Sequence, residues 1–63
     1  MSDEVLISVE EAARRLGVSR SFLYPRVLRG EIASVKLGRS RRVVATGLEE
    51  YVRDRLAGAE RPA

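Results

Sequence analysis

The sequence predicts a small, mainly α-helical domain with one β-hairpin, in the order helix, helix, strand, strand, helix. Apolar residues recur at helical spacing near both ends of the chain, and the spacing changes to strand-like alternation after Gly30. Only Gly17 to Ser19 separate the first two helices. At 63 residues the chain is expected to form one domain over residues 1–57, followed by a flexible tail at residues 58–63.

The first helix is predicted over residues 9–16. Its apolar positions are Val9, Ala12, Ala13 and Leu16. These residues follow the i, i+3, i+4, i+7 spacing that places side chains on one helical face. Ser8 and Glu11 have the spacing of a capping box, and Gly17 stands where a left-handed residue ends a helix.

The second helix is predicted to begin after Ser19, which is suited to cap its first turn, and to end at Gly30. Leu23 and Val27 are its expected inward residues. Pro25 lies between them and lacks the N–H that a helix interior requires. Because Leu23 and Val27 still share a face, we expect a kink or a tightened turn there rather than a break.

The hairpin and the last helix follow from the second half of the chain. Val35 and Leu37 alternate with the polar residues before them. Val43 and Ala45 alternate with Arg42 and Val44. The turn between the two strands is Gly38-Arg39-Ser40. Thr46 and Glu49 form a second capping box, and the apolar face of the helix behind it is Leu48, Tyr51, Val52 and Leu56.

Charge is distributed unevenly along the chain. Residues 20–42 contain seven cations against Glu31 alone, a net charge of +6, whereas the remaining residues sum to −3. Cations gathered in this way are typical of a surface that binds a polyanion such as nucleic acid. The alternative is an ordinary solvated surface.

Several classes of function are disfavoured. The chain has no cysteine and no histidine, which argues against a disulfide scaffold, a zinc site and common nucleophilic chemistry. Its apolar runs are shorter than the roughly 20 residues that a membrane span requires. We therefore expect a cytoplasmic protein that is not an enzyme and binds no cofactor, metal, membrane or small molecule.

Two helices joined by a three-residue turn indicate a helix-turn-helix, because the basic segment begins with the second helix. The basic hairpin adds a wing. The alternative is a helical hairpin that only packs. The chain also resembles the excisionase-type helix-turn-helix family, a compact relative of the MerR-like winged helices. The matching segments are Ser8-Val9-Glu10-Glu11-Ala12-Ala13, Leu16-Gly17-Val18-Ser19-Arg20, Tyr24, Gly30-Glu31-Ile32, Val35-Lys36-Leu37-Gly38-Arg39, Arg41-Arg42 and Leu48-Glu49-Glu50-Tyr51.

The resemblance implies that the start of the second helix faces double-stranded DNA. The matching positions are Ser19, Arg20, Ser21 and Tyr24. Arg20 is suited to read a guanine edge, and the hydroxyls to hold phosphates. Tyr24 is equally suited to pack against the hairpin. Arg26 is expected either to flank the DNA backbone or to be a solvated helix charge.

The turn of the hairpin carries the second set of candidate contacts. These are Lys36, Arg39, Ser40, Arg41 and Arg42. A basic two-strand turn can straddle a phosphate ridge or place an arginine in a narrow minor groove. Charges on a strand edge also prevent unwanted pairing, but four cations within seven residues exceed that need.

The resemblance further implies a recombination directionality factor that acts on the nucleoid of a bacterial cell and is encoded in some cases by a phage. Such a protein binds and bends DNA, occupies adjacent sites as several copies, and favours excision by a tyrosine integrase. A small MerR-like transcriptional regulator is the alternative. A module whose basic patch binds an acidic protein surface is a third interpretation.

Overall fold

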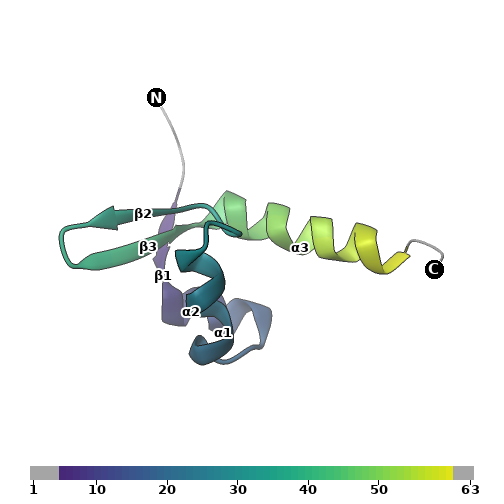
Figure 1. The fold of residues 1–63 in the computed structure, drawn as a ribbon, viewed down its shortest axis with the longest axis horizontal. Helices are drawn as coiled ribbons and strands as arrows, with labels where there is room; N and C mark the ends of the chain where they lie inside the picture. The colour runs from purple at the N-terminus through teal and green to yellow at the C-terminus, as the bar shows by residue number, and fades with distance from the viewer. Residues whose placement is uncertain (1–4, 61–63) are drawn as a thin grey trace.

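The computed structural model describes residues 5–60 and contains three helices and a three-stranded antiparallel sheet (Figure 1). The elements are β1 (Leu6–Ser8), α1 (Val9–Leu16), α2 (Arg20–Leu28), β2 (Ser34–Leu37), β3 (Ser40–Val44) and α3 (Ala45–Glu60). The sheet order is β1-β3-β2, and the hairpin of β2 and β3 projects away from the helices while α3 extends to the opposite side. The predicted fold class, a mainly α winged helix-turn-helix, is confirmed.

The strand β1 is an element that the sequence did not predict. It pairs with β3, and Ile7 lies opposite Val43 in the register. Both side chains are buried, with exposed fractions of 8% and 0%. Because only three residues form β1, they are too few to display the alternation by which a strand is recognised.

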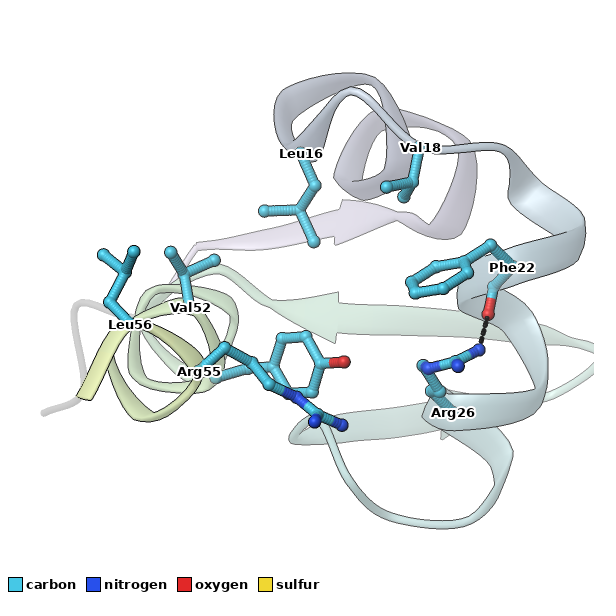
Figure 2. Close-up of a pocket in the computed structure, with 8 residues that line it drawn as sticks. Leu16, Val18, Phe22, Arg26, Val52, Arg55 and Leu56 are labelled. Carbon is cyan, nitrogen blue, oxygen red and sulfur yellow. Dashed lines mark hydrogen bonds between the residues drawn. The ribbon is translucent and has the colours of Figure 1, made fainter. Parts of the chain in front are cut away.

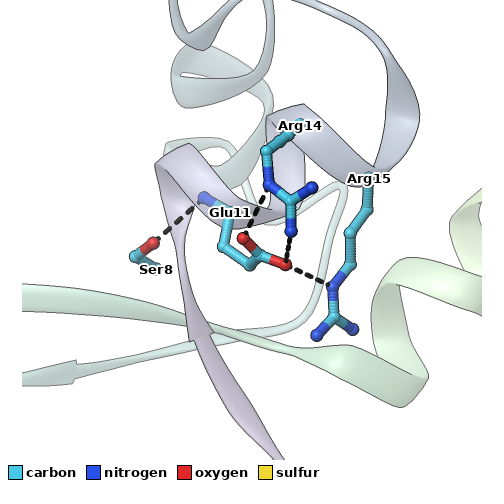
Figure 3. Close-up of polar contacts among 4 residues, drawn as sticks. All are labelled: Ser8, Glu11, Arg14 and Arg15. Atoms are coloured by element: carbon cyan, nitrogen blue, oxygen red, sulfur yellow. Dashed lines mark hydrogen bonds and ion pairs between the residues drawn. The ribbon is translucent and has the colours of Figure 1, made fainter.

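The start of α1 is capped as predicted, although the capping glutamate has other partners (Figure 3). The backbone N–H of Glu11 donates to Ser8 Oγ at 3.0 Å. The Glu11 carboxylate accepts hydrogen bonds from Arg14, the shortest at 2.7 Å, and from Arg15 at 3.0 Å. The acid therefore ties the first turn of α1 to its last.

The turn between α1 and α2 has the predicted geometry. Gly17 adopts a left-handed conformation with φ of 71°, and Ser19 Oγ accepts a hydrogen bond from the N–H of Phe22 at 3.1 Å. Beyond this cap, α2 continues through Pro25 without a break, as expected. Pro25 is exposed, so its ring points away from the core.

The core lies between the two packed helices and one face of the sheet. It consists of Ile7, Val9, Ala12, Ala13, Leu23, Val27, Ile32, Val43 and Leu48. The predicted inward residues of α2, Leu23 and Val27, have exposed fractions of 0% and 1%. Ala12 and Ala13 are equally buried, and their small side chains allow α2 to lie close to α1.

The apolar residues of β2 do not reach this core. In the register Val35 lies opposite Arg42, whereas the neighbouring Ser34 lies opposite the buried Val43. Since paired residues share a face of a sheet, Val35 and Leu37 belong to the outer face. Their side chains are 38% and 55% exposed.

The start of α3 differs from the prediction. Thr46 was expected to cap the helix from outside and Ala45 to belong to the strand, but the helix begins at Ala45, directly after β3. The N–H of Ala45 donates to the carbonyl of Val5 at 2.9 Å, so a backbone hydrogen bond ties the start of the helix to the segment before β1. The prediction of a Thr46 cap is therefore wrong.

The end of α3 also lies later than expected. The helix continues through Glu60, past the predicted domain end at residue 57, and the last part of the predicted tail, residues 61–63, lies outside the described residues. Leu48 on the predicted apolar face is buried, but Leu56 is 57% exposed. No helix within residues 5–60 is long and apolar enough to cross a membrane.

Two glycines of α3 provide a matched test of the packing. A Cβ added at Gly47 would lie 2.6 Å from the Cβ of Ala33, whereas a Cβ at Gly58 would meet nothing within 4 Å. We predict that Gly47→Ala lowers the free energy of unfolding by about 1–3 kcal/mol through overpacking. Gly58→Ala should raise it by up to about 1 kcal/mol, because alanine is the better helix former.

Urea denaturation followed by circular dichroism at 222 nm measures both variants. A stabilised Gly47→Ala variant would show that α3 does not approach the segment before β2 as closely as described.

Candidate nucleic-acid interface

A groove runs between α2 and the hairpin, and most of the cations predicted to bind DNA line it. Two adjoining hollows form this groove and share Tyr24, Arg39 and Arg41. The first is also lined by Ser8, Val9, Glu10, Arg20, Ser40 and Arg42. The second is also lined by Leu28, Lys36 and Gly38. We call this surface the basic groove.

The helix side of the basic groove is formed by residues one turn apart on α2. Arg20 and Tyr24 are separated by four positions, which places them on one face of a helix. The guanidinium carbon of Arg20 lies 4.5 Å from the centre of the Tyr24 ring, within cation–π range. Tyr24 is half-buried and packs against the core, which agrees with the packing interpretation, and it also lines the groove.

Arg20 also has an acidic partner. Its Nε donates to Oε2 of Glu10 at 2.8 Å, and the two side chains remain 53% and 66% exposed. The pKa of the Glu10 carboxyl lies below its ordinary value, because the backbone N–H of Glu10 and then the Arg20 side chain donate to it. The carboxylate is therefore charged at neutral pH.

The wing side of the groove is built on the pairing of β2 with β3. Lys36 lies opposite Arg41 in the register, so both cations are on one face of the hairpin. Arg41 is oriented by a hydrogen bond of 3.1 Å from its Nη1 to Ser34 Oγ. At the turn, Gly38 adopts φ of 62°, and the exposed Arg39 follows it.

The cations of the wing differ from most of the other arginines in their partners. Among the described residues, the wing cations Lys36, Arg39, Arg41 and Arg42 form no ion pair within 4 Å. Elsewhere, arginines of α1 pair with Glu11, and Arg29 pairs with Glu31 at 2.7 Å. The wing cations are thus free to meet an external anion.

Three predicted contact residues lie outside the groove lining. Ser19 is engaged as the cap of α2, with its Oγ accepting from the N–H of Phe22, and Ser21 is exposed on that helix. Arg26 is six positions from Arg20, and at about 100° per residue it lies well round the helix from that residue. The structure therefore does not bring Arg26 together with the other candidates.

Arg26 instead lines an apolar pocket on the other side of α2, next to α3 (Figure 2). The pocket has a volume of about 540 Å³ and is lined by Leu16, Val18, Phe22, Arg26, Tyr51, Val52, Arg55 and Leu56. The guanidinium of Arg26 lies 3.7 Å from the centre of the Phe22 ring, and its Nη1 donates to the Phe22 carbonyl at 2.6 Å. These contacts fix the side chain away from the basic groove.

Glu10 is the charged residue of the groove that sequence reasoning missed. The sequence pattern assigned it no role in the site. The structure brings it to Arg20, ten positions later, because α1 and α2 cross closely. No spacing along the chain marks such a pair, since it depends on how two helices pack.

The geometry defines a class of protein. Two helices joined by a tight turn, with the start of the second helix beside a basic hairpin, constitute a winged helix-turn-helix. Residues 6–56 match the model of a family described as "Helix-turn-helix domain". Together with the similarity to a protein named as an excisionase, this match shows that the chain belongs to the excisionase-type helix-turn-helix family of DNA-binding domains.

The similar protein comes from Saccharopolyspora erythraea and is named "Probable excisionase". It is 45% identical over 51 residues, which are 81% of this chain and 52% of that protein. The chain therefore spans about half the length of this relative. No solved structure matches the chain.

The ion pairs of the domain predict how stability depends on pH. The pKa values of Glu10, Glu11 and Glu31 are lowered from 4.5, for Glu11 by hydrogen bonds from Arg14 and Arg15 and for Glu31 mainly by Arg29. A lowered pKa in the folded state means that the unfolded chain binds protons more readily. The stabilisation is therefore present above about pH 4.5 and is lost as the pH falls through the folded-state values.

Thermal unfolding between pH 7 and pH 3 measures this loss as a fall in Tm. Glu11→Gln should flatten the acid limb of the curve, because it removes the carboxylate that two arginines share. An acid limb that keeps its slope in this variant would contradict the assignment.

Proposed function

We propose that this protein is an excisionase. It binds specific sites in double-stranded DNA as several adjacent copies, bends the duplex, and thereby directs a tyrosine integrase towards excision of an integrated element. It acts on the bacterial nucleoid in the cytoplasm. The name of the 45% identical relative supports this role, and family membership supports the DNA binding on which the role depends.

The observation that carries the proposal is that the start of α2 and the wing line one groove. Arg20 and Tyr24 come from the helix, and Arg39, Arg41 and Arg42 from the hairpin. A major groove about 12 Å wide admits a helix, and the adjacent phosphates or minor groove then lie within reach of a wing. Contact on both sides of a phosphate ridge requires the helix start and the wing to lie on one side of the molecule, and the groove that both of them line supports this arrangement.

Within this proposal the candidate residues divide by task. Arg20 reads a base edge, because its terminal nitrogens can donate together to guanine O6 and N7. Ser19, Ser21 and Tyr24 lie at the start of α2, where hydroxyl groups can hold phosphates and set the register. Arg26 is left out of the contact set, because it lies against Phe22 beside the apolar pocket.

The wing cations are expected to bind DNA without regard to sequence. Arg41→Ala should weaken binding to every duplex and lower the slope of log K against log salt concentration by about one, for one lost phosphate contact. Arg53→Ala is the matched control, because Arg53 is an exposed cation on α3 that does not line the groove. Fluorescence anisotropy over a salt series measures both slopes.

Equal slopes for Arg41→Ala and the wild type would remove the wing from the interface. A loss of affinity in Arg53→Ala as large as that in Arg41→Ala would show a general effect of net charge rather than a contact.

The excisionase role predicts a distinct behaviour on DNA that contains the attachment site of the integrated element. Titration in a mobility-shift assay should yield successive complexes, and circularly permuted fragments should reveal a bend. A bend of 40–90° costs on the order of 1–6 kcal/mol, which contacts in both grooves offset. In a reaction with the cognate integrase, the protein should raise excision, and Arg41→Ala should reduce this effect.

A single unbent complex together with unchanged excision would contradict the excisionase role and favour a promoter-binding regulator. Indifference to duplex DNA in the same titration would contradict DNA binding altogether.

A further inference from the structure

Glu10 is the one acid among the described residues that line the basic groove. A carboxylate on a surface that faces phosphates weakens binding to any duplex, because like charges repel. Its ion pair with Arg20 contributes little to the fold, since both partners are more than half exposed. The position of Glu10 therefore calls for an explanation that involves DNA.

The hydrogen bond between Glu10 and Arg20 leaves the terminal nitrogens of the Arg20 guanidinium free. A guanidinium carries five N–H donors, and the bond to Glu10 uses the one on Nε. The four N–H groups on the two terminal nitrogens remain available for an external acceptor. Tyr24 holds the same guanidinium against its ring at 4.5 Å.

We propose that Glu10 is a specificity-determining residue that positions Arg20 for one base edge. It holds Arg20 by Nε, so the two terminal nitrogens point together towards a planar pair of acceptors such as O6 and N7 of guanine. It also disfavours the alternative in which Arg20 swings away to bind a phosphate. The proposal rests on the DNA-binding function, and it assigns to Glu10 a role that the sequence did not suggest.

Two physical effects produce this selectivity. An arginine that is already ordered loses less conformational entropy on binding, and the advantage applies only to the geometry in which it is ordered. The negative charge of Glu10 acts on every phosphate nearby, so it lowers the affinity for duplexes that cannot offer the compensating base contact. The lowered pKa of Glu10 keeps this charge in place at neutral pH.

The test begins with selection of a preferred site for the wild type from randomised duplexes. Fluorescence anisotropy then measures Kd for that site, for the site with each guanine replaced in turn, and for a random-sequence duplex. One bidentate arginine–guanine contact corresponds to a discrimination of about 5- to 150-fold. Circular dichroism melts check that every variant is folded.

Glu10→Ala removes both the charge and the hydrogen bond, and Glu10→Gln removes the charge while keeping an acceptor. Both variants should bind the random duplex more tightly than the wild type. Discrimination at the guanine read by Arg20 should fall several-fold in Glu10→Ala and less in Glu10→Gln. The matched control is Glu50→Ala, which removes an exposed carboxylate of α3 outside the groove and should leave discrimination unchanged.

The double variant separates positioning from direct contact. In an Arg20→Ala background, Glu10→Ala should cause no further loss of discrimination, because the group that it positions is gone. A further loss there would mean that Glu10 reads a base itself and would overturn the positioning role.

Two other outcomes are decisive. Unchanged discrimination in Glu10→Ala, with a wild type that selects a site, would overturn this inference and leave the proposed function intact. A wild type that binds no duplex would overturn both.

Discussion

The close packing of α2 on α1 is the constraint on which the rest of the structure depends. Ala13 on α1 is small and buried, and Leu23 and Val27 of α2 are buried beside it in the core. Burial of these two residues sets the rotation of α2 about its axis. As a result Arg20 faces the basic groove, whereas Arg26, further round the same helix, faces the apolar pocket. The contact that stabilises the domain thus also decides which arginines are presented together.

Ion pairs also divide the cations into those with an acidic partner and those without one. Glu11 and Glu31 engage arginines that lie outside the groove, and these pairs are exposed, so each adds little stability. Their larger effect is on the distribution of free charge. Among the described residues, positive charge without an ion-pair partner is concentrated on the wing, although the chain as a whole carries a net charge of only +3.

Local signals in the sequence were sufficient for most of the fold. The bounds of α1, the cap at Ser19, the left-handed Gly17 and the hairpin all follow from neighbours within about four residues, and the structure confirms them, except that Ser40 of the predicted turn belongs to β3. The strand β1 and the helix start at Ala45 were missed, because each is stabilised by backbone hydrogen bonds to a distant part of the chain.

Prediction of the candidate site from the sequence had similar limits. The family resemblance indicated the helix start, the clustered charges indicated the wing, and the structure places most of these residues along one groove. The orientation of Arg26 and the pairing of Glu10 with Arg20 were not predictable, because they depend on how α2 is rotated and how closely it crosses α1. Patterns along a single chain contain neither quantity.

The junction between β3 and α3 has a mechanical consequence. Val44 ends the strand and Ala45 begins the helix, so no intervening residue can act as a hinge. Backbone bonds from these two residues to Ala33 and Val5 brace the junction on both sides. Any force that tilts the tip of the hairpin is therefore transmitted as torque to α3, whose far end projects beyond the rest of the domain (Figure 1).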